Sequence, residues 1–410
     1  MRNKVMCLSE ALDTKQVPFL CPAIANGSHC PLFGVTMATP FMEDLAVLIV
    51  GTAECCWHSK NQHMATGSRQ PFYTYVLDNS EVVFGADQAL REALQTIWRE
   101  CHPKAIALVS SCVPELIGEN FEEIAEEADL PIPVLPVRTS HYNSSGYYRG
   151  IQHFYSSFLP IMARGEKNDR VALLGARYAG MERSEIYRLL RESGREILIP
   201  HRAEEMASLP DCALLVVVDI TALDLAESIS RRFGTPYVRL DRICRPQSIA
   251  QCYRQIDGFL GTDLTDRSQP QYRQVLEKME QVRKKWAGKR FCFGAPFFLP
   301  FENSLFFAQM GLIPAFLLAR EFFPEDDRWA EELLDLGFDP GIASFASMGE
   351  LEEALPEMDI SMFFGATHLQ GLEKARMLTI NPHAMPVHFG YALPLEILDQ
   401  MLKEQEKEGS

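Results

Sequence analysis

Short apolar runs alternate with helical patterns in the first part of the chain. The runs LAVLIVGT at residues 45–52 and AIALVSS at residues 105–111 have the length of buried strands, and residues 86–100 carry apolar side chains at helical spacing. Strands that alternate with helices of this length form βαβ units, in which the strands are parallel and the crossovers right-handed. We therefore predict a first α/β domain over residues 1–165.

The same alternation of strands and helices occurs twice more. The second unit contains the segments 170–180, 184–194, 196–200, 213–218, 225–234 and 236–240. The third follows a charged helix at 274–289 and contains the segments 290–296, 304–311, 315–320, 359–366 and 385–392. Polar stretches at 163–170 and 283–289 give boundaries for domains 166–287 and 288–410. We expect three Rossmann-like α/β domains with parallel sheets.

Composition narrows the class of protein. The hydrophobic fraction of 47% and the charged fraction of 23% are those of an ordinary globular protein. The net charge of −16 argues against nucleic acid or a membrane as a partner, because both bind basic surfaces. An acidic surface would suit a basic protein partner, or would simply keep the protein soluble.

The chain shows no signal for secretion or membrane insertion. Its longest apolar runs are of strand length, well below the roughly 20 residues of a membrane span, and residues 1–15 lack the apolar core of a signal peptide. Eleven cysteines without the regular spacing of a secreted scaffold indicate a reducing compartment. We therefore expect a cytoplasmic protein whose cysteines are thiols or metal ligands.

Four cysteines fall on three loops that converge on one sheet edge. Cys55 and Cys56 follow the strand at 45–52, and Cys112 directly follows the strand at 105–111. The carboxyl ends of parallel strands share an edge, where ligands usually bind. Cys30 lies after a turn signal and before Pro31, so its loop could reach the same edge. This placement indicates a soft-metal site, although without a CxxC pair four buried thiols are an alternative.

Four segments carry a family resemblance. They are CPLFGV at 30–35, LIVGTAECCWHSKN at 48–61, LDNSEVVFGADQAL at 77–90 and HPKAIALVSSCVPELIGENFEEIAEE at 102–127. In order and spacing they resemble the nitrogenase component 1-like family. That family includes nitrogenase molybdenum–iron protein subunits, cofactor-assembly scaffolds, and dark-operative protochlorophyllide and chlorophyllide reductases. The resemblance is strong over 20–130 and extends at domain level to 170–240 and 288–395.

The resemblance implies an iron–sulfur cluster, of the 4Fe-4S or P-cluster-like type, held by Cys30, Cys55 and Cys112. Cys55 is preferred to Cys56 because it occupies the place after G-T-x-x. In related proteins a second subunit completes the shell, while here Cys21 or Cys56 could also do so, or could be ordinary thiols. The remaining cysteines are expected to be structural: Cys7, Cys101, Cys212, Cys244, Cys252 and Cys292.

The resemblance also implies partners. It predicts an identical or paralogous component 1 subunit and a separate ATP-dependent iron–sulfur reductase protein as electron donor. Gly175 and Gly180 lie in GARYAG, which lacks the Lys and hydroxyl residue of a P-loop, so ATP would act only through the partner. Glu54, His58 and Glu115 lie beside the cluster cysteines and could tune the reduction potential of the cluster. For both glutamates, a charge exposed to solvent is the simpler interpretation.

The substrate stays open. Asp219 stands where the nitrogenase α subunit has the cysteine that anchors its cofactor, and His368, His383 and His388 give no convincing counterpart of its histidine ligand. These departures argue against dinitrogen reduction. The alternatives are a scaffold for metal-cofactor assembly, a binding protein without redox chemistry, and a zinc site of four thiolates.

Overall fold

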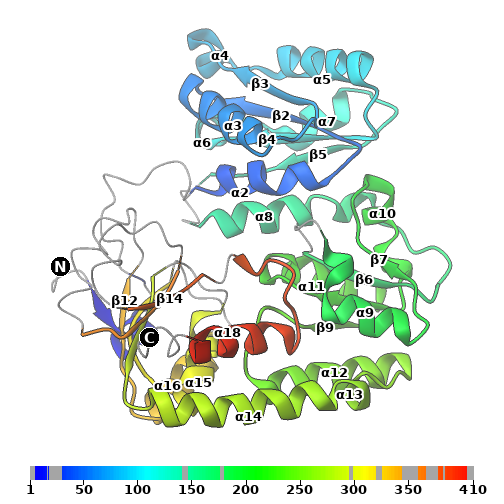
Figure 1. Cartoon of the computed structure of the whole chain (residues 1–410). Helices are drawn as coiled ribbons and strands as arrows, with labels where there is room; N and C mark the ends of the chain where they lie inside the picture. Colours follow the sequence, from blue (N-terminus) through cyan, green and yellow to red (C-terminus); the bar gives the residue numbers. More distant parts are fainter. Residues whose placement is uncertain are drawn as a thin grey trace. The chain divides into compact units, whose positions relative to one another are not determined.

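The protein is described by a computed structural model (Figure 1). It describes residues 5–15, 17, 30–140, 146–175, 180–294, 299–319, 326–343, 359–365, 377–381 and 384–403. The chain forms two compact units. One contains Asn26–Arg177 and Glu196–Tyr237, and the other contains Met1–Ala25, Tyr178–Arg195 and Val238–Ser410.

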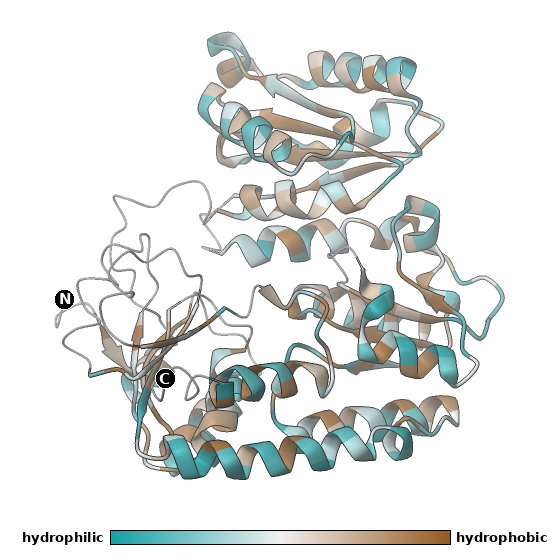
Figure 2. Cartoon of the chain, viewed as in Figure 1, coloured by the Kyte–Doolittle hydropathy of each residue, from teal (hydrophilic) through white to brown (hydrophobic). Residues whose placement is uncertain are grey.

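The first sheet has the strand order β3-β2-β4-β5, with all neighbours parallel. Its strands are β2 (Leu45–Gly51), β3 (Phe72–Val76), β4 (Ala105–Ser110) and β5 (Val134–Val137). Every residue of β2 and β4 is buried, as in central strands that are covered on both faces. Figure 2 shows these strands as strongly hydrophobic, whereas the helices carry both polar and apolar residues.

The helices of this first domain pack around that sheet. They are α2 (Pro31–Ala38), α3 (Ala53–Ala65), α4 (Asn79–Phe84), α5 (Asp87–Cys101), α6 (Cys112–Ile117), α7 (Phe121–Glu127) and α8 (Tyr147–Ser156). Leu90 and Leu94 of α5 and Phe121 of α7 pack against Leu48 and Leu108 of the central strands. This core holds the strands in place and so fixes the edge at which the cysteines lie.

The second sheet has the order β7-β6-β8-β9, and β6 is parallel to β7 and to β8. Its strands are β6 (Val171–Leu174), β7 (Ile197–Leu198), β8 (Leu214–Val217) and β9 (Tyr237–Arg239). The helices along this part of the chain are α9 (Glu185–Glu192), α10 (Ala203–Ala207) and α11 (Leu223–Phe233).

The third sheet has the order β1-β12-β11-β10-β13-β14. Its strands are β1 (Met6–Cys7), β10 (Arg290–Phe293), β11 (Ile313–Leu318), β12 (Gly341–Ala343), β13 (Met362–Phe364) and β14 (Leu378–Ile380). All pairs are parallel except β1 with β12. The same unit contains α1 (Leu8–Thr14), α12 (Pro246–Leu260), α13 (Leu264–Arg267), α14 (Gln269–Trp286), α15 (Pro300–Gln309), α16 (Asp326–Asp335) and α18 (Ala392–Lys403). Lys278 of α14 pairs with Asp399 of α18, which lies along it (Figure 1).

The predicted α/β class with parallel sheets is confirmed. Two details differ from the sequence-based expectation. The apolar run at 385–392 forms no strand, and β14 lies earlier, at Leu378–Ile380. The antiparallel strand β1 was not predicted, because two residues are too short to give a periodic pattern. The domain boundaries near residues 165 and 287 stay predictions.

No helix in the described ranges is both long and apolar enough to cross a membrane.

Candidate metal centre

Cys30, Cys55 and Cys112 each lie at the start of a helix. Cys30 is the residue that caps α2, Cys55 lies in the first turn of α3, and Cys112 is the first residue of α6. The Thr52 hydroxyl accepts a hydrogen bond of 3.5 Å from the Cys55 amide and so fixes the start of α3. Because α3 and α6 follow the neighbouring parallel strands β2 and β4, Cys55 and Cys112 share one sheet edge.

The thiol of Cys30 lies close enough to the other two for their charges to act on it. Burial raises the pKa of Cys30, and the negative charges of Cys55 and Cys112 raise it further. The backbone amides of Phe33 and Leu32 at the start of α2 lower this pKa, and the Phe33 amide donates a hydrogen bond to the Cys30 carbonyl oxygen at 3.1 Å. A bound cation would stabilise thiolates gathered at one sheet edge.

A small residue at this edge allows the Ser111 side chain to approach the end of β2 closely. Gly51 ends β2, and a Cβ added to it would lie 2.2 Å from Ser111 Oγ and 3.5 Å from Cys55 Cβ. A side chain at position 51 would therefore clash with the Ser111 side chain between the β2 and β4 ends. The Ser111 hydroxyl is buried there without a hydrogen-bond partner among the described residues.

A close helix crossing fixes the position of Cys30. Helices α2 and α8 lie side by side (Figure 1). A Cβ on Gly34 would lie 1.8 Å from the Tyr147 carbonyl oxygen, and a Cβ on Gly150 would lie 1.8 Å from the Pro31 carbonyl oxygen. The two backbones can approach this closely only because both positions are glycine. Since Pro31 follows Cys30, the crossing also holds the first cysteine.

Cys56 points away from this centre. The buried residues of α3 are Cys56, Ser59 and His63, which share one helix face. The Cys56 thiol donates to the Tyr75 carbonyl oxygen at 3.4 Å. Burial and the neighbouring Cys55 raise the pKa of Cys56 to about 11. The geometry therefore favours Cys55 as the ligand, while Cys21 lies outside the described residues.

The remaining described cysteines lie elsewhere in the fold. Cys292 lies inside β10 with no exposed surface, and burial alone raises its pKa. Cys101 lies 2.8 Å from the Tyr73 hydroxyl, and Cys7 is exposed on β1. Cys212, Cys244 and Cys252 are buried. None of these described cysteines forms a disulfide.

Zinc and iron–sulfur clusters need their ligands arranged differently. Among the described residues, no three His, Cys, Asp or Glu side chains gather around the position of a single ion. A zinc ion needs its ligands at one point. In an iron–sulfur cluster each thiolate binds a different iron atom, so the ligands are separated by the body of the cluster. Because iron–sulfur clusters are held by Cys thiolates, the chemistry of this donor set fits a cluster.

The side chains next to the cysteines have different surroundings. Glu54 is exposed, as expected of a solvated charge. The expectation of a solvated charge is wrong for Glu115. Its carboxylate accepts hydrogen bonds from the Thr139 amide at 2.6 Å and the Ser140 amide at 2.9 Å. It also accepts one from the Ser110 hydroxyl. Glu115 therefore ties the start of α6 to the segment after β5.

His58 lies one helical turn beyond Cys55. Its Nε2 atom is buried without a hydrogen-bond partner among the described residues, and its ring lies 6.5 Å from that of Phe33. Of the three C-terminal histidines, His388 is described, and His368 and His383 lie outside the described residues.

Asp219 lies at the carboxyl end of β8. Its Oδ1 atom accepts hydrogen bonds from the Thr221 amide at 2.9 Å and the Thr221 hydroxyl at 2.6 Å, so this carboxylate caps a turn. Gly175, with φ +84°, lies against it, since an added Cβ would be 2.7 Å from Asp219 Cβ. Gly175 is thus needed for a close backbone approach, which supports the turn interpretation of this glycine rather than a phosphate loop.

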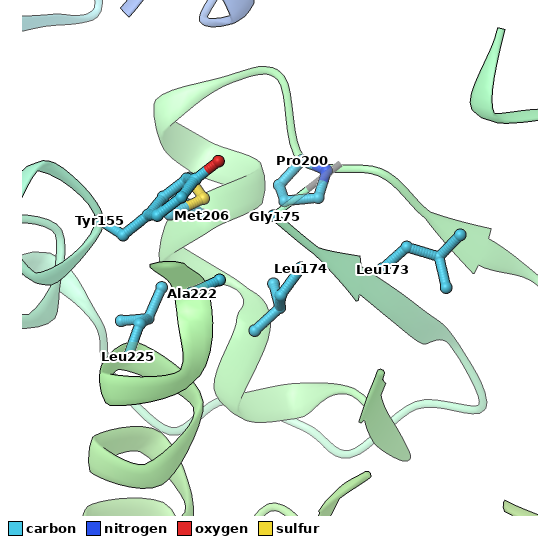
Figure 3. Close-up of a pocket in the computed structure, with 8 residues that line it drawn as sticks. All are labelled: Tyr155, Leu173, Leu174, Gly175, Pro200, Met206, Ala222 and Leu225. Carbon is cyan, nitrogen blue, oxygen red and sulfur yellow. The ribbon is translucent and has the colours of Figure 1, made fainter. Parts of the chain in front are cut away.

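A small pocket lies beside Gly175 at the end of β6. Figure 3 shows its lining, which comprises Tyr155, Leu173, Leu174, Gly175, Pro200, Met206, Ala222 and Leu225. The Tyr155 hydroxyl is the one polar side-chain group among these lining residues. With neither a thiol nor a charged group in its lining, the pocket does not provide metal ligands.

Sequence reasoning missed Gly51 and Ser111 as parts of the site. Both are small residues at the ends of buried strands, which is the signal that could have pointed to them.

A family model described as nitrogenase component 1 type oxidoreductase matches residues 30–404. The chain belongs to this family. The match begins at Cys30 and includes all three cysteines of the centre. The predicted family resemblance is confirmed.

Relatives within the family have different names. The nitrogenase iron-molybdenum cofactor biosynthesis protein NifE of Rippkaea orientalis is 23% identical over 66% of this chain and 61% of its own length. The nitrogenase molybdenum-iron protein alpha chain of Methanosarcina barkeri is 21% identical over 65% of this chain and 55% of its own length. A light-independent protochlorophyllide reductase subunit of Bradyrhizobium sp. (strain ORS 278) is 27% identical over 48% of this chain and 42% of its own length.

The chain spans about half the length of the curated relatives that it matches. Among solved structures, one titled "Nitrogenase Cp1 at pH 6.5" superimposes with a TM-score of 0.76 at 13% identity, covering 93% of this chain and 94% of that one. This likeness establishes the component 1 fold.

Proposed function

We propose that this component 1 family member is an oxidoreductase subunit that holds an iron–sulfur cluster by Cys30, Cys55 and Cys112. The observation that carries the proposal is the arrangement of these thiols: each lies at the start of a helix, and Cys55 and Cys112 follow the neighbouring parallel strands β2 and β4. Thiolates are the ligands that iron–sulfur clusters require. Such thiols persist in a reducing compartment, so we place the protein in the cytoplasm.

The residues around the thiols have distinct roles in this proposal. Three thiolates would hold the iron atoms, and the amides of Phe33 and Leu32 at the start of α2 favour negative charge on the Cys30 sulfur. When bound, the cluster would store and pass on electrons. A fourth ligand would come from a second component 1 subunit, identical or paralogous, so we expect an oligomer in solution.

An exposed apolar surface next to the cysteines supports a protein partner. We use the term α4–α6 surface for the exposed side chains of Val83, Phe84, Leu116 and Ile117. Phe84 is 87% exposed. Helices α4 and α6 contact each other. Large apolar side chains that cluster in the open often mark protein interfaces. Helix α6 begins at Cys112, so a partner on this surface would lie near the cluster.

We assign this α4–α6 surface to the ATP-dependent iron–sulfur reductase. Electrons must travel from the reductase to the cluster, and a docking site beside Cys112 keeps that path short. The segment GARYAG lacks the Lys and hydroxyl residue of a P-loop, so ATP hydrolysis belongs to the partner. The substrate that finally accepts the electrons is left unassigned.

The NifE relatives favour a second function. NifE is named as a cofactor biosynthesis protein, so this chain could instead be a scaffold on which a metal cofactor is assembled. Both functions use the same fold and could use the same cysteines. A purified protein that carries a transferable metal-cofactor precursor, and is not reoxidised by any substrate, would favour the scaffold.

Metal analysis after anaerobic purification tests the cluster. We expect iron and acid-labile sulfide in the full chain, and loss of most of the iron in each of Cys30→Ala, Cys55→Ala and Cys112→Ala. Cys292→Ala is the matched control, because this thiol is fully buried in β10, outside the centre. It should retain its iron. Zinc in place of iron, or full iron in all three variants, would refute the proposal.

A further inference from the structure

The hydroxyl of Ser111 has no assigned role, although Ser111 directly precedes Cys112 and packs against the end of β2. Ser111 separates β4 from Cys112 and is 1% exposed. Its Oγ atom is buried and has no hydrogen-bond partner in the described part of the chain. A buried hydroxyl without a partner is unfavourable, so a group that completes the site is expected to use it.

Helix capping does not explain the hydroxyl. Ser111 is the N-cap residue of α6, a position where serine usually accepts a bond from the helix backbone. Here the side chain makes no such bond. The Ser111 amide, in contrast, donates to the Val50 carbonyl oxygen at 2.9 Å, so the backbone of this residue is firmly held at the strand end.

Gly51 leaves the room that the Ser111 hydroxyl occupies. A Cβ at position 51 would lie 2.2 Å from Ser111 Oγ and 2.8 Å from Ser111 Cβ, and 3.5 Å from Cys55 Cβ. The hydroxyl thus lies between the strand ends that carry Cys55 and Cys112. No carbonyl or carboxylate among the described residues accepts its proton.

The neighbouring serine shows the contrast. Ser110 is equally buried, but its hydroxyl lies by the Glu115 carboxylate and 3.4 Å from the Val137 carbonyl oxygen. One serine of the pair is therefore used by the protein itself. The other is held at the centre with its hydroxyl unused.

We propose that Ser111 is a positioning residue whose hydroxyl donates a hydrogen bond to a sulfur atom of the bound cluster and raises the reduction potential of that cluster. This rests on the proposed function. Reduction adds one electron, so the cluster becomes more negative. A hydroxyl that points at a sulfur stabilises this reduced form more than the oxidised form. The cluster therefore becomes easier to reduce.

The test compares Ser111→Ala, Ser111→Thr and Ser110→Ala with the unchanged chain. Each is purified without oxygen, its iron and sulfide are measured, and the midpoint potential is taken from a redox titration followed by electron paramagnetic resonance. We expect Ser111→Ala to keep its iron and shift to a more negative potential. The Ser111→Thr variant keeps a hydroxyl, so its midpoint potential should be closer to that of the unchanged chain. Ser110→Ala should leave the potential unchanged.

The outcomes separate the two proposals. If the unchanged chain binds no iron, the proposed function itself fails. If it binds iron and Ser111→Ala has the original potential, only the role of Ser111 is wrong. Should Ser111→Ala lose its iron, retention of iron in Ser111→Thr would support the hydroxyl as the needed group, whereas loss in both variants would overturn its role as a donor.

Discussion

Cys55 and Cys56 are neighbours in the sequence with different surroundings. A helix turns by about 100° per residue, so adjacent side chains cannot share one face. Cys56 lies on the buried face of α3 with its thiol on a backbone carbonyl, while Cys55 is half-buried at the sheet edge. At the residue scale, the orientation of α3 decides which thiol can serve as a ligand.

Replacing Cys56 with alanine tests that orientation. We expect Cys56→Ala to keep the full iron content and to lose about 1 kcal/mol of unfolding free energy, since a small cavity replaces the buried sulfur. The measurements are iron analysis and denaturant unfolding, with Cys55→Ala as the paired variant. If Cys56→Ala loses its iron and Cys55→Ala keeps it, then Cys56 is the ligand and the choice of Cys55 was wrong.

A buried carboxylate in the unit that contains Tyr178–Arg195 permits a test of how the stability of the protein depends on pH. Glu185 of α9 accepts hydrogen bonds from the Tyr253 hydroxyl at 2.6 Å and the Tyr391 amide at 3.1 Å. Burial raises the pKa of Glu185 above its ordinary value of 4.5, and these bonds only partly oppose the shift. The folded protein therefore holds this proton more tightly than the unfolded chain does.

The sign of the pH effect follows from that pKa. The stabilising effect of the protonated Glu185 is complete below pH 4.5 and is lost as the pH rises through the higher folded value. The Glu185→Gln variant keeps a neutral acceptor that does not titrate. Its unfolding free energy should therefore increase relative to that of the unchanged chain as the pH rises. Glu185→Ala should lose roughly 2–4 kcal/mol, because the Tyr253 hydroxyl is left buried without a partner. A difference between Glu185→Gln and the unchanged chain that stays constant with pH would contradict this.

The sequence predicted the three thiols but not the groups around them. Strand ends, visible as the ends of apolar runs, led to Cys55, Cys56 and Cys112, and the family resemblance singled out Cys30, Cys55 and Cys112, whose role as ligands stays a prediction. Gly51 and Ser111 acquire their meaning only from the pairing of β2 with β4, which brings together residues that are far apart in the chain. The hydrogen bonds of Glu115 also reach across 24 and 25 residues, so local pattern could not reveal them.

At the scale of helices, the α2–α8 crossing holds the first cysteine. We expect Gly150→Ala to push the two helices apart, because the new Cβ would lie 1.8 Å from the Pro31 carbonyl oxygen. Such overpacking costs about 1–3 kcal/mol. The variant should also retain less iron, since Cys30 moves with Pro31. Both effects are measured by thermal unfolding and iron analysis.

Gly258 provides a matched control within a helix. It lies in α12, it is exposed, and an added Cβ would meet nothing within 4 Å. Gly258→Ala should therefore stabilise the protein by roughly 0.5–1 kcal/mol, as alanine does in helix interiors, and leave iron unchanged. Equal behaviour of the two alanine variants would mean that the crossing does not hold the centre.

Strand prediction failed where an apolar run was buried without being extended. The run at 385–392 contains Met385, Phe389 and Tyr391, which are all buried, yet no strand forms there. Short apolar runs do not distinguish a strand from a buried loop. Tyr391 instead contacts Glu185 through its backbone, a contact across 206 residues that no local pattern could show.

For the molecule as a whole, three sheets are built by a chain that forms two compact units. Both units are discontinuous in sequence, because the segment Tyr178–Arg195 belongs to the unit that also holds the C-terminal part. Polar stretches mark boundaries between continuous segments, and the discontinuity of these units appears only in the contacts of the folded chain. The parallel sheets themselves could be predicted, since each depends on local alternation of strands and helices.

The α4–α6 surface gives the prediction that concerns partners. Phe84→Asp would place a charge where the reductase is proposed to dock, and removing a central aromatic contact commonly costs about 2 kcal/mol or more. Electron delivery from the ATP-dependent reductase should therefore slow by about tenfold or more, whereas reduction by dithionite should be unchanged. Phe259→Asp is the matched control, since Phe259 is 55% exposed on α12, in the other unit. Stopped-flow reduction measures both variants. If Phe84→Asp and Phe259→Asp are reduced at the same rate by the reductase, the α4–α6 surface is not its docking site; if Phe84→Asp instead breaks the oligomer, the surface joins component 1 subunits.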